Sequence, residues 1–525
     1  MKSKVKTFYS HLVNFLSDHS LAIILIIALT ASLTTDIWSY QHNYITAYGD
    51  AKSHLNISRR VFDNLNPGLA QLGSAWLPLL HVLMFSFILN DFLYYSGLAG
   101  TIVSFVFYLL SNVYLFKLIA KLTKNNIIGL IGTLIFTLNI NVLYMQSTPM
   151  TETIASFFII AVFYYFFTWQ ESRKLSHLII LSSMIFLGTF TRYELWVYAP
   201  AIFVGIVFTY LGNKLSVKNF KELESNLIIF CFCGLFGIFL WLLWNLLIFN
   251  DPLYFLHSVY SAEAYQRSLI SRGLNRPYHN IFYATQYYLQ SVADVSSWVL
   301  IILGFVGSIY AFLKRKILIM FGLFIVSFSV FAFETYAIYK GNTTIYVPEL
   351  FPYDYYNIRY GIYALPFFAL FSSVLLLIKN KFFKFLVLST IFILIAYPLY
   401  KFKPITLDDS ISPKMKKITI NAERDFQNFF AKNYHGGLIL ITAGDSDGLI
   451  YVSHIALKKF ITEGNQKYWQ ESLKNPSKYA SWIVLRDARG TRSLLTNTLW
   501  GSPKISNHFD LVYEKYGVLI YKKNK

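Results

Sequence analysis

The 525-residue sequence has few charged residues and almost no cysteine. Charged side chains make up 14% of it, whereas soluble domains contain about 25%, so the composition excludes an ordinary water-soluble domain. The two cysteines, Cys231 and Cys233, cannot form a disulfide framework. They lie within an apolar run, where packing explains them better than a metal site. The chain also lacks internal repeats and low-complexity tracts. Hydrophobic residues make up 55% of the sequence.

The apolar residues occur in long blocks, for example at 21–33, 227–249 and 298–312. Such blocks cross or nearly cross a hydrocarbon core of about 30 Å, so the sequence predicts a polytopic α-helical membrane protein. The first block is long, has no small-residue cleavage site and precedes many similar segments, unlike a cleaved signal peptide. The predicted spans are about 20–38, 92–117, 127–146, 151–169, 177–192, 194–212, 227–249, 296–313, 317–337, 360–378 and 383–400.

The basic residues predict the topology. A net charge of +19 would suggest nucleic acid in a soluble protein, but here the basic residues cluster in every second connection between spans. The positive-inside rule therefore predicts about eleven transmembrane helices, a cytoplasmic N-terminus and an external C-terminus, and no nucleic-acid partner. The clusters are Lys2, Lys4 and Lys6; Lys117, Lys121 and Lys124; Arg173 and Lys174; Lys214, Lys218 and Lys221; Lys314, Arg315 and Lys316; and Lys379, Lys381 and Lys384.

One apolar segment, 76–89, is excluded from the spans. It is too short to cross the membrane with confidence and contains Pro78 and His81, so we interpret it as an interfacial or re-entrant helix. With this choice, four substantial connections are external: about 37–91, 146–152, 250–295 and 338–360. The tripeptides Asn56-Ile57-Ser58 and Asn342-Thr343-Thr344, on the same predicted side, match the weak N-glycosylation motif.

The composition changes at about residue 403. Residues 437–442 and 481–485 are typical of buried strands, and 509–513 with 518–521 of a hairpin. The sequence thus predicts a transmembrane module at 1–402 and a small extracytoplasmic α/β domain at 403–525. Asp445 and Asp447, which follow the first strand, are interpreted as loop acids.

Isolated ionisable residues stand near the external ends of the predicted spans. A charged side chain in such a position is a functional hypothesis by default. The candidates are Asp50, Glu152, Arg192, Glu194 and Arg359, with Lys52, His54, Arg59 and Arg60 near the first of them in sequence.

Each candidate also has a plain structural explanation. Asp50 alone is typical of a solvated loop acid, and Arg59 is typical of an anchor at the membrane interface. Arg192 and Glu194 are spaced to pair locally at a helical break. Glu152 follows Thr148-Pro149, so it stands in the first turn of a helix, where an acid interacts favourably with the helix dipole.

Carboxylates and several cations on one face of a membrane suit glycosyl transfer from a phosphate-linked sugar. The leaving group is already an anion, so it requires cations rather than a general acid. The acceptor hydroxyl requires a base, and one carboxylate is enough. Arginine suits the phosphate because its planar fork can donate two parallel hydrogen bonds.

Five short motifs occur in a fixed order on the predicted external side. They are Tyr48-Gly49-Asp50-Ala51 with His54-Leu55, Thr148-Pro149-Met150-Thr151-Glu152, Thr191-Arg192-Tyr193-Glu194, Asn250-Asp251-Pro252-Leu253-Tyr254, and Asn357 with Arg359-Tyr360. Through them about residues 20–400 resemble the GT-C membrane glycosyltransferases. The motifs resemble most those of the family 39 enzymes, which include protein O-mannosyltransferases and aminoarabinose transferases of lipid A.

The resemblance implies a polyprenyl- or dolichyl-phosphate sugar donor and catalysis on the external face. It implies that Asp50 is the catalytic acid of the first loop and that Glu152 matches the second acidic position. The sequence departs from the family where Ala51 follows Asp50, because the eukaryotic mannosyltransferases have an adjacent Asp-Glu pair. It has neither an inserted sugar-binding module nor the Trp-Trp-Asp signature of oligosaccharyltransferases, which argues against transfer of a whole glycan to asparagine.

The resulting hypothesis is a hexosyl- or mannosyltransferase-like enzyme in the plasma or inner membrane of a prokaryote. It moves one sugar, with inversion, to a hydroxyl of a protein, lipid or glycan. No metal signature is present, and a weakly bound divalent cation is left open. The assigned roles are general base for Asp50, acceptor positioning or support of the base for Glu152, donor phosphate binding for Arg359, Arg192 and Arg59, and support for His54 and Glu194.

Two other classes of protein remain as alternatives. A transporter or flippase of a lipid-linked substrate also needs a groove and charged residues in the membrane. Its polar residues and helix breaks are expected at mid-span in two matching repeats, which this sequence lacks. The second alternative is an inactive scaffold that binds sugar or lipid, against which Asp50 and Glu152 argue only modestly.

Overall fold

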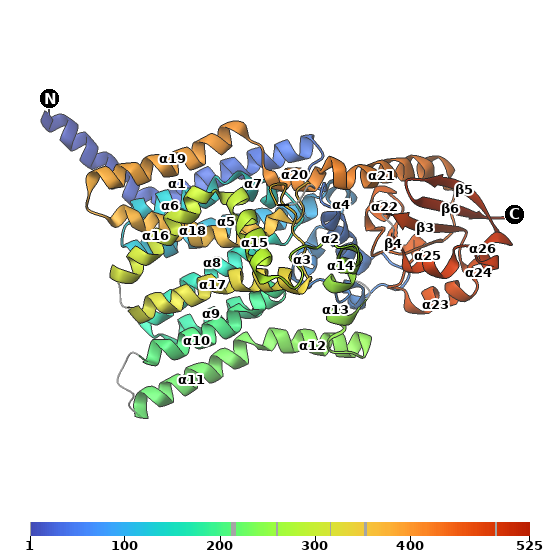
Figure 1. Ribbon diagram of the computed structural model, residues 1–525, viewed down its shortest axis with the longest axis horizontal. Helices are drawn as coiled ribbons and strands as arrows, with labels where there is room; N and C mark the ends of the chain where they lie inside the picture. Colours follow the sequence, from blue (N-terminus) through green and yellow to red (C-terminus); the bar gives the residue numbers. More distant parts are fainter. Residues whose placement is uncertain are drawn as a thin grey trace.

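The computed structural model describes residues 2–211, 217–258, 261–314, 317–350, 354–488 and 491–524. A bundle of long helices forms one part of the molecule, and a C-terminal α/β domain lies beyond one end of that bundle (Figure 1). Short helices and loops fill the space between the two parts. Three residues of the predicted basic clusters, Lys214, Arg315 and Lys316, lie outside the described residues.

The long apolar runs of the sequence form the bundle. Its members are α1 (Lys2–Gln41), α5 (Leu98–Thr123), α6 (Asn126–Thr137), α7 (Ile140–Gln146), α8 (Glu152–Ser172), α9 (Leu175–Thr189), η3 (Tyr193–Trp196), α10 (Tyr198–Leu211), α11 (Val217–Gly234), α12 (Phe236–Phe249), α15 (Ile281–Ser296), α16 (Trp298–Lys314), α17 (Ile317–Lys340), η4 (Ile358–Ala364), α18 (Leu365–Val374), η5 (Leu375–Leu377) and α19 (Lys381–Lys401).

The bundle confirms an integral membrane protein. Within the described residues, seven helical stretches are long and apolar enough to cross a membrane, and nine if each of two sharply bent pairs counts as one span. The predicted number of about eleven and the N-in/C-out orientation stay predictions. The segment 76–89 contains only the short helices α3 (Leu79–Leu83) and η2 (Met84–Ser86), in agreement with its exclusion from the spans.

Several predicted spans have different bounds. The span predicted at 127–146 is broken between α6 and α7, which are bent by 66°, and the span predicted at 227–249 is divided between α11 and α12. The span predicted at 92–117 is divided at Gly97, whose φ of 81° ends α4 (Asp91–Ser96) before α5 begins. The span predicted at 296–313 is preceded by α15, and the chain turns by 102° at Ser297 to enter α16. Hydrophobicity finds the apolar residues, but these local backbone turns decide where the helices end.

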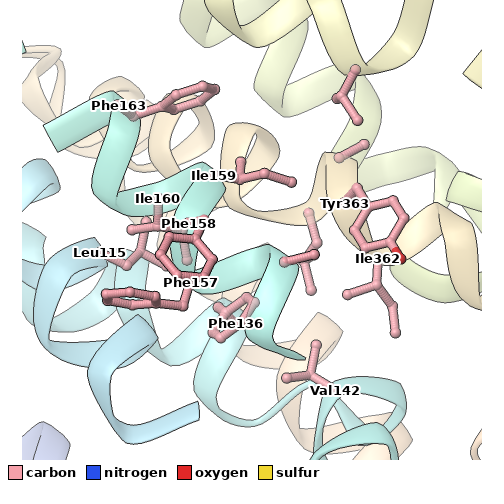
Figure 2. Packing of buried hydrophobic residues seen from close by; sticks show 14 of the residues in the cluster. Leu115, Phe136, Val142, Phe157, Phe158, Ile159, Ile160, Phe163, Ile362 and Tyr363 are labelled. Atoms are coloured by element: carbon pink, nitrogen blue, oxygen red, sulfur yellow. The ribbon is translucent and has the colours of Figure 1, made fainter. Parts of the chain in front are cut away.

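Side chains from segments far apart in sequence pack tightly in the bundle. Figure 2 shows Leu115 of α5, Phe136 of α6, Phe158 of α8 and Tyr363 of η4 in one hydrophobic cluster. Close backbone approaches accompany this packing. A Cβ atom at Gly307 of α16 would lie 1.9 Å from the carbonyl oxygen of Phe371 in α18.

The C-terminal domain is a sheet covered by helices on both faces. Strand order is β2-β1-β3-β6-β5, with β1, β2 and β3 parallel, β6 and β5 antiparallel, and β4 paired only with β3. The strands are β1 (Ile439–Ile441), β2 (Phe460–Ile461), β3 (Trp482–Ala488), β4 (Thr491–Arg492), β5 (Phe509–Lys515) and β6 (Val518–Lys523). The two strands and the hairpin predicted from sequence are present, whereas β2 and β4 were not predicted.

Helices of this domain cover both faces of the sheet, the earlier ones on one face and the later ones on the other. One hydrophobic cluster joins one face to α21 (Pro413–Asn433) and α22 (Asp447–Val452). The other joins the opposite face to α23 (Gln466–Lys474) and α25 (Leu494–Leu499). The loops after β1 and β2 therefore leave in opposite directions, and the carboxyl ends of these parallel strands border an open crevice.

The two parts of the molecule are joined through α2 (Gly49–Arg60), the helix that contains Asp50. Asn56 Nδ2 donates to the carbonyl oxygen and to Oδ1 of Asp447, at 2.9 and 3.0 Å. Asn56 is fully buried, so its sequon is closed to glycosylation in the folded protein. Tyr451 of α22 donates to the carbonyl oxygens of Tyr94 and Tyr95 at 3.0 and 2.7 Å.

Candidate active site

Helix α2 presents Asp50 at its first turn. Tyr48 precedes the helix in an extended conformation, and the carboxylate of Asp50 stands at the positive end of the helix dipole. Residues at helical spacing, Ala51, His54, Leu55 and Ser58, are buried. The side chain of Asp50 is 43% exposed, so its carboxylate is accessible from solvent.

The carboxylate of Asp50 is held by Arg359, which comes from the seven-residue 3₁₀ helix η4. Arg359 Nη2 donates to Asp50 Oδ2 at 2.6 Å, and Arg359 Nε donates to Glu152 Oε1 at 2.9 Å. The guanidinium carbon of Arg359 also lies 4.8 Å from the centre of the Tyr48 ring. One arginine therefore connects the acid of α2 to the acid at the start of α8.

Arg192 approaches the same acid from the break between α9 and η3. Its Nη1 donates to Glu152 Oε1 at 3.3 Å and to Thr151 Oγ1 at 3.0 Å. Its Nε and Nη2 both donate to Glu194 Oε1, at 2.8 and 2.6 Å. The structure thus brings together five of the residues singled out from the sequence: Asp50, Glu152, Arg192, Glu194 and Arg359.

Two buried acids that the sequence analysis missed support this cluster. Glu334 of α17 is 1% exposed, and the charge of Glu194 is among those that act on it. Asp409, also 1% exposed, accepts hydrogen bonds from the Tyr48 hydroxyl at 3.0 Å and from the backbone N–H of Asn357 at 3.2 Å.

The signal for Glu334 was present in the sequence. It is a single acid within the predicted span 317–337, and an ionisable group there is a functional candidate by default. Asp409 gave no such signal, because it belongs to α20 (Ile405–Ile411), a short helix in the segment assigned to the C-terminal domain. Burial and the nearby Asp409 charge raise the pKa of Tyr48 well above its usual value, so its hydroxyl stays a hydrogen-bond donor.

A cavity of about 2730 Å³ lies against this cluster. Asp50, Arg192, Glu194 and Arg359 line its wall, but the fully buried Glu152 does not. The cavity extends to the carboxyl ends of β1 and β2, where its lining includes Gly444, Asp445, Glu463 and Gly464. Apolar residues of α10, α12 and α17 line another part of it: Pro200, Ile238, Leu242, Leu247, Phe333 and Ala337.

The loop after β1 is held by the loop after β2. The two carboxylate oxygens of Glu463 accept the backbone N–H groups of Ala443 and Gly444, each at 2.9 Å. Burial raises the pKa of Asp445, which lines the same wall, to about 6. Asp445 and Asp447 were interpreted from the sequence as loop acids, but both line the cavity, and Asp447 also joins the C-terminal domain to α2.

Arg59 lies apart from the cluster. Its Nη2 donates to Asp91 at 2.5 Å, and its guanidinium stacks on Tyr94, so the structure does not bring it to the cavity as predicted. Arg60 lines the cavity instead, with its Nη2 3.8 Å from Asp447 Oδ2. Among the residues that the structure describes, no three His, Cys, Asp or Glu side chains are grouped to hold a metal.

Comparison with known proteins supports the fold. No family model matches the sequence, and no curated protein is detectably similar to it. The structure is similar to that of ArnT from Cupriavidus metallidurans bound to undecaprenyl phosphate, with a TM-score of 0.57 and 8% identity over 95% of this chain and 97% of ArnT. The apo state of ArnT gives a TM-score of 0.50 and 10% identity over the same shares.

An oligosaccharyltransferase is also similar in structure. The apo form of the enzyme from Archaeoglobus fulgidus has a TM-score of 0.51 and 10% identity, covering 90% of this chain and 70% of that protein. The predicted GT-C-like fold, a transmembrane helical bundle with a small α/β C-terminal domain, is therefore confirmed.

Proposed function

We propose that this GT-C-fold membrane protein transfers a single sugar from a polyprenyl- or dolichyl-phosphate donor to an acceptor hydroxyl. The observation that carries the proposal is the ion-pair chain Asp50–Arg359–Glu152–Arg192 on the wall of a cavity with both apolar and polar linings. The similarity to ArnT, described with undecaprenyl phosphate bound, supports this donor class. The positive-inside rule supports an extracytoplasmic site.

Arg359 and Arg192 would bind the donor phosphate. Both line the cavity and both are fixed from behind by Glu152, so their positions are set before the donor arrives. The apolar lining from α10, α12 and α17 would receive the proximal part of the lipid tail. A phosphate that binds Arg359 competes with Asp50 for the same guanidinium.

Asp50 would act as general base. The acceptor oxygen forms a bond to the anomeric carbon, the bond from that carbon to the phosphate oxygen breaks, and the lipid phosphate leaves as an anion. The acceptor proton moves to the Asp50 carboxylate. A single displacement of this kind inverts the anomeric carbon, and two cations suffice to stabilise the leaving phosphate.

Glu152 and Glu194 would act through the arginines. Glu152 is fully buried and absent from the cavity wall, so it cannot touch the acceptor, and we assign it the supporting role alone. Glu194 holds the other edge of Arg192 through two hydrogen bonds. Both residues are positioning residues.

The acceptor would enter from the C-terminal domain. The carboxyl ends of parallel strands are a common position for ligands in α/β domains, and here the loops after β1 and β2 face the cavity. Carboxylate and backbone groups on that wall are suited to a hydroxyl-rich acceptor. A protein, a lipid or a glycan would each provide the required hydroxyl.

The test is transfer by purified protein from radiolabelled polyprenyl-phosphate sugars to a membrane extract. We expect Asp50→Asn to lower the rate at least about 100-fold, the usual contribution of a general base. Asp510→Asn, an exposed acid on β5, is the matched control and should transfer normally. Equal transfer by Asp50→Asn and wild type would contradict the base assignment, and donor flipping without transfer would favour a transporter.

A further inference from the structure

A pair of buried histidines lies beside the arginine cluster. His54 on α2 and His81 on α3 are 4% and 0% exposed, and His54 Nδ1 lies 2.9 Å from His81 Nε2. The His54 ring packs against Trp76, with 4.5 Å between ring centres. His54 is one helical turn beyond Asp50 and lines the same cavity.

Both imidazoles are neutral at physiological pH. Burial first, and then the positive charges of Arg192 and Arg359, lower the pKa of His54 to about 3. Burial first, and then His54 and Arg60, hold the pKa of His81 well below its usual value. Each neutral ring therefore has one N–H donor and one acceptor nitrogen.

The surroundings of His81 decide which nitrogen carries the hydrogen. His81 Nδ1 is buried and has no hydrogen-bond partner among the described residues. If His54 donated to His81, the hydrogen of His81 would be on this orphaned nitrogen, and buried N–H groups without a partner are rare. If His81 Nε2 donates instead, only a lone pair is left unpaired at Nδ1.

If His81 Nε2 is the donor, the position of the hydrogen on the His54 ring follows. Its Nδ1 accepts from His81, so its hydrogen is on Nε2. No hydrogen bond of His54 Nε2 occurs within the described residues, and this nitrogen is not among the buried polar atoms that lack a partner. The Nε2–H group is therefore accessible from the cavity that His54 lines.

We propose that the Nε2–H group of His54 donates a hydrogen bond to a phosphate oxygen of the lipid-linked donor. The inference rests on the proposed function and adds a binding residue to it. His54 is one helical turn from Asp50, which is hydrogen-bonded to Arg359. His54, Arg192 and Arg359 also line the same cavity, so a phosphate held by these arginines lies on the side of the cavity that His54 faces. As a neutral donor, His54 adds a directed contact without repelling either arginine.

Two substitutions distinguish the roles of the two ring nitrogens of His54. Asparagine carries its amide at the δ position and can still accept from His81, but it has no donor at the ε position. Glutamine carries a donor at the ε position. We expect His54→Asn to weaken binding of undecaprenyl phosphate in nanodiscs about 10- to 100-fold, as for loss of a hydrogen bond to a charged group. His54→Gln should retain more of the affinity.

Two controls test whether the effect is specific to His54 and to the phosphate of the lipid. His435→Asn, at an exposed position of the C-terminal domain, should bind like wild type. Undecaprenol, which lacks the phosphate, should show no difference between wild type and His54→Asn. Binding by His54→Asn within about twofold of wild type would overturn the inference. Failure of wild-type protein to bind undecaprenyl phosphate would instead overturn the proposed function.

Solid-state NMR of ¹⁵N-histidine in the wild-type protein tests the same contact without a substitution. We expect the His54 resonances, identified by their loss in His54→Asn, to show hydrogen on Nε2 and none on Nδ1. Undecaprenyl phosphate should shift the Nε2 resonance. Hydrogen on Nδ1, or an Nε2 resonance unchanged by the bound lipid, would overturn the inference even if affinity fell.

Discussion

At the residue scale, a single oxygen atom of Glu152 organises the candidate site. Oε1 accepts from both Arg359 and Arg192, while Oε2 is buried with no partner within the described residues. Removing one member of a buried ion pair leaves the other charge uncompensated, which typically costs about 3–5 kcal/mol. Here one deletion would affect two arginines.

We therefore expect Glu152→Ala to lower both stability and transfer, the stability by about 3–5 kcal/mol. Glu152→Gln keeps an oxygen for the arginines and should be less harmful than alanine. Thermal unfolding in detergent and initial transfer rates measure the two effects. Glu171→Ala, on the same helix but about one-third exposed, is the control. Wild-type stability in Glu152→Ala would contradict the supporting role.

The sequence predicted most residues of this cluster but not which neighbouring side chains face the cavity. Asp50, Glu152, Arg192, Glu194 and Arg359 were found because charges near span ends are unusual. Adjacent residues on a helix point about 100° apart. Which of the neighbours Arg59 and Arg60 faces the cavity depends on how α2 packs, and this cannot be read from two consecutive arginines. Contacts of Glu152 with Arg359 join residues 207 positions apart.

At the element scale, α16 and α18 are in direct backbone contact. The absent side chain of Gly307 leaves room for the carbonyl oxygen of Phe371, which would lie 1.9 Å from a Cβ atom. A carbonyl group within a helix cannot move independently of that helix. The two helices must therefore separate if position 307 acquires a side chain.

We expect Gly307→Ala to destabilise the protein although alanine favours helices by up to about 1 kcal/mol. Gly234→Ala is the matched control, because its Cβ would meet the Phe230 ring at an ordinary 3.4 Å. Circular dichroism during heating should show a lower unfolding temperature for the first variant and an equal or higher one for the second. The opposite order would show that the contact between α16 and α18 is more adaptable than these distances imply.

The elements themselves were largely predictable from hydrophobic runs and strand patterns. Their ends were not, because Gly97 adopts a left-handed conformation and Ser297 has a φ of 105°. A hydrophobicity profile does not report the backbone conformation that ends the helices at these two residues. The two-residue strands β2 and β4 are too short for an alternating pattern, so only their pairing with longer strands defines them.

At the scale of the whole molecule, α2 connects the helical bundle to the C-terminal domain. Besides the bonds of Asn56 to Asp447, the carboxylate of Asp63, in the turn that follows α2, accepts the backbone N–H groups of Leu457 and Lys458 at 3.1 and 3.2 Å. The same helix carries Asp50. The sequence indicated two parts of the molecule and a catalytic side of the membrane that they share. The contacts between the parts join residues nearly 400 positions apart, so no local sequence pattern predicts them.

We expect Asn56→Ala to loosen the C-terminal domain, because it leaves the buried Asp447 with fewer hydrogen bonds. Hydrogen–deuterium exchange should increase in α22 and α2 and stay unchanged in α8. Transfer should fall, since the helix that holds Asp50 loses support. Asn433→Ala, an exposed position of the C-terminal domain, should change neither. Unaltered exchange in α22 would mean that the other contacts hold the domain in place.

The hydrogen bond between Arg359 and Asp50 has a consequence for the order of substrate binding. In the empty site the base is bonded to a group that the donor requires. An acceptor that binds first therefore meets a carboxylate whose Oδ2 is already hydrogen-bonded to Arg359. When the donor phosphate takes over Arg359, Oδ2 of Asp50 becomes free to accept the proton of the acceptor hydroxyl while the sugar is in place. The proposed reaction therefore has a compulsory order of substrate binding, in which the lipid-linked sugar binds before the acceptor.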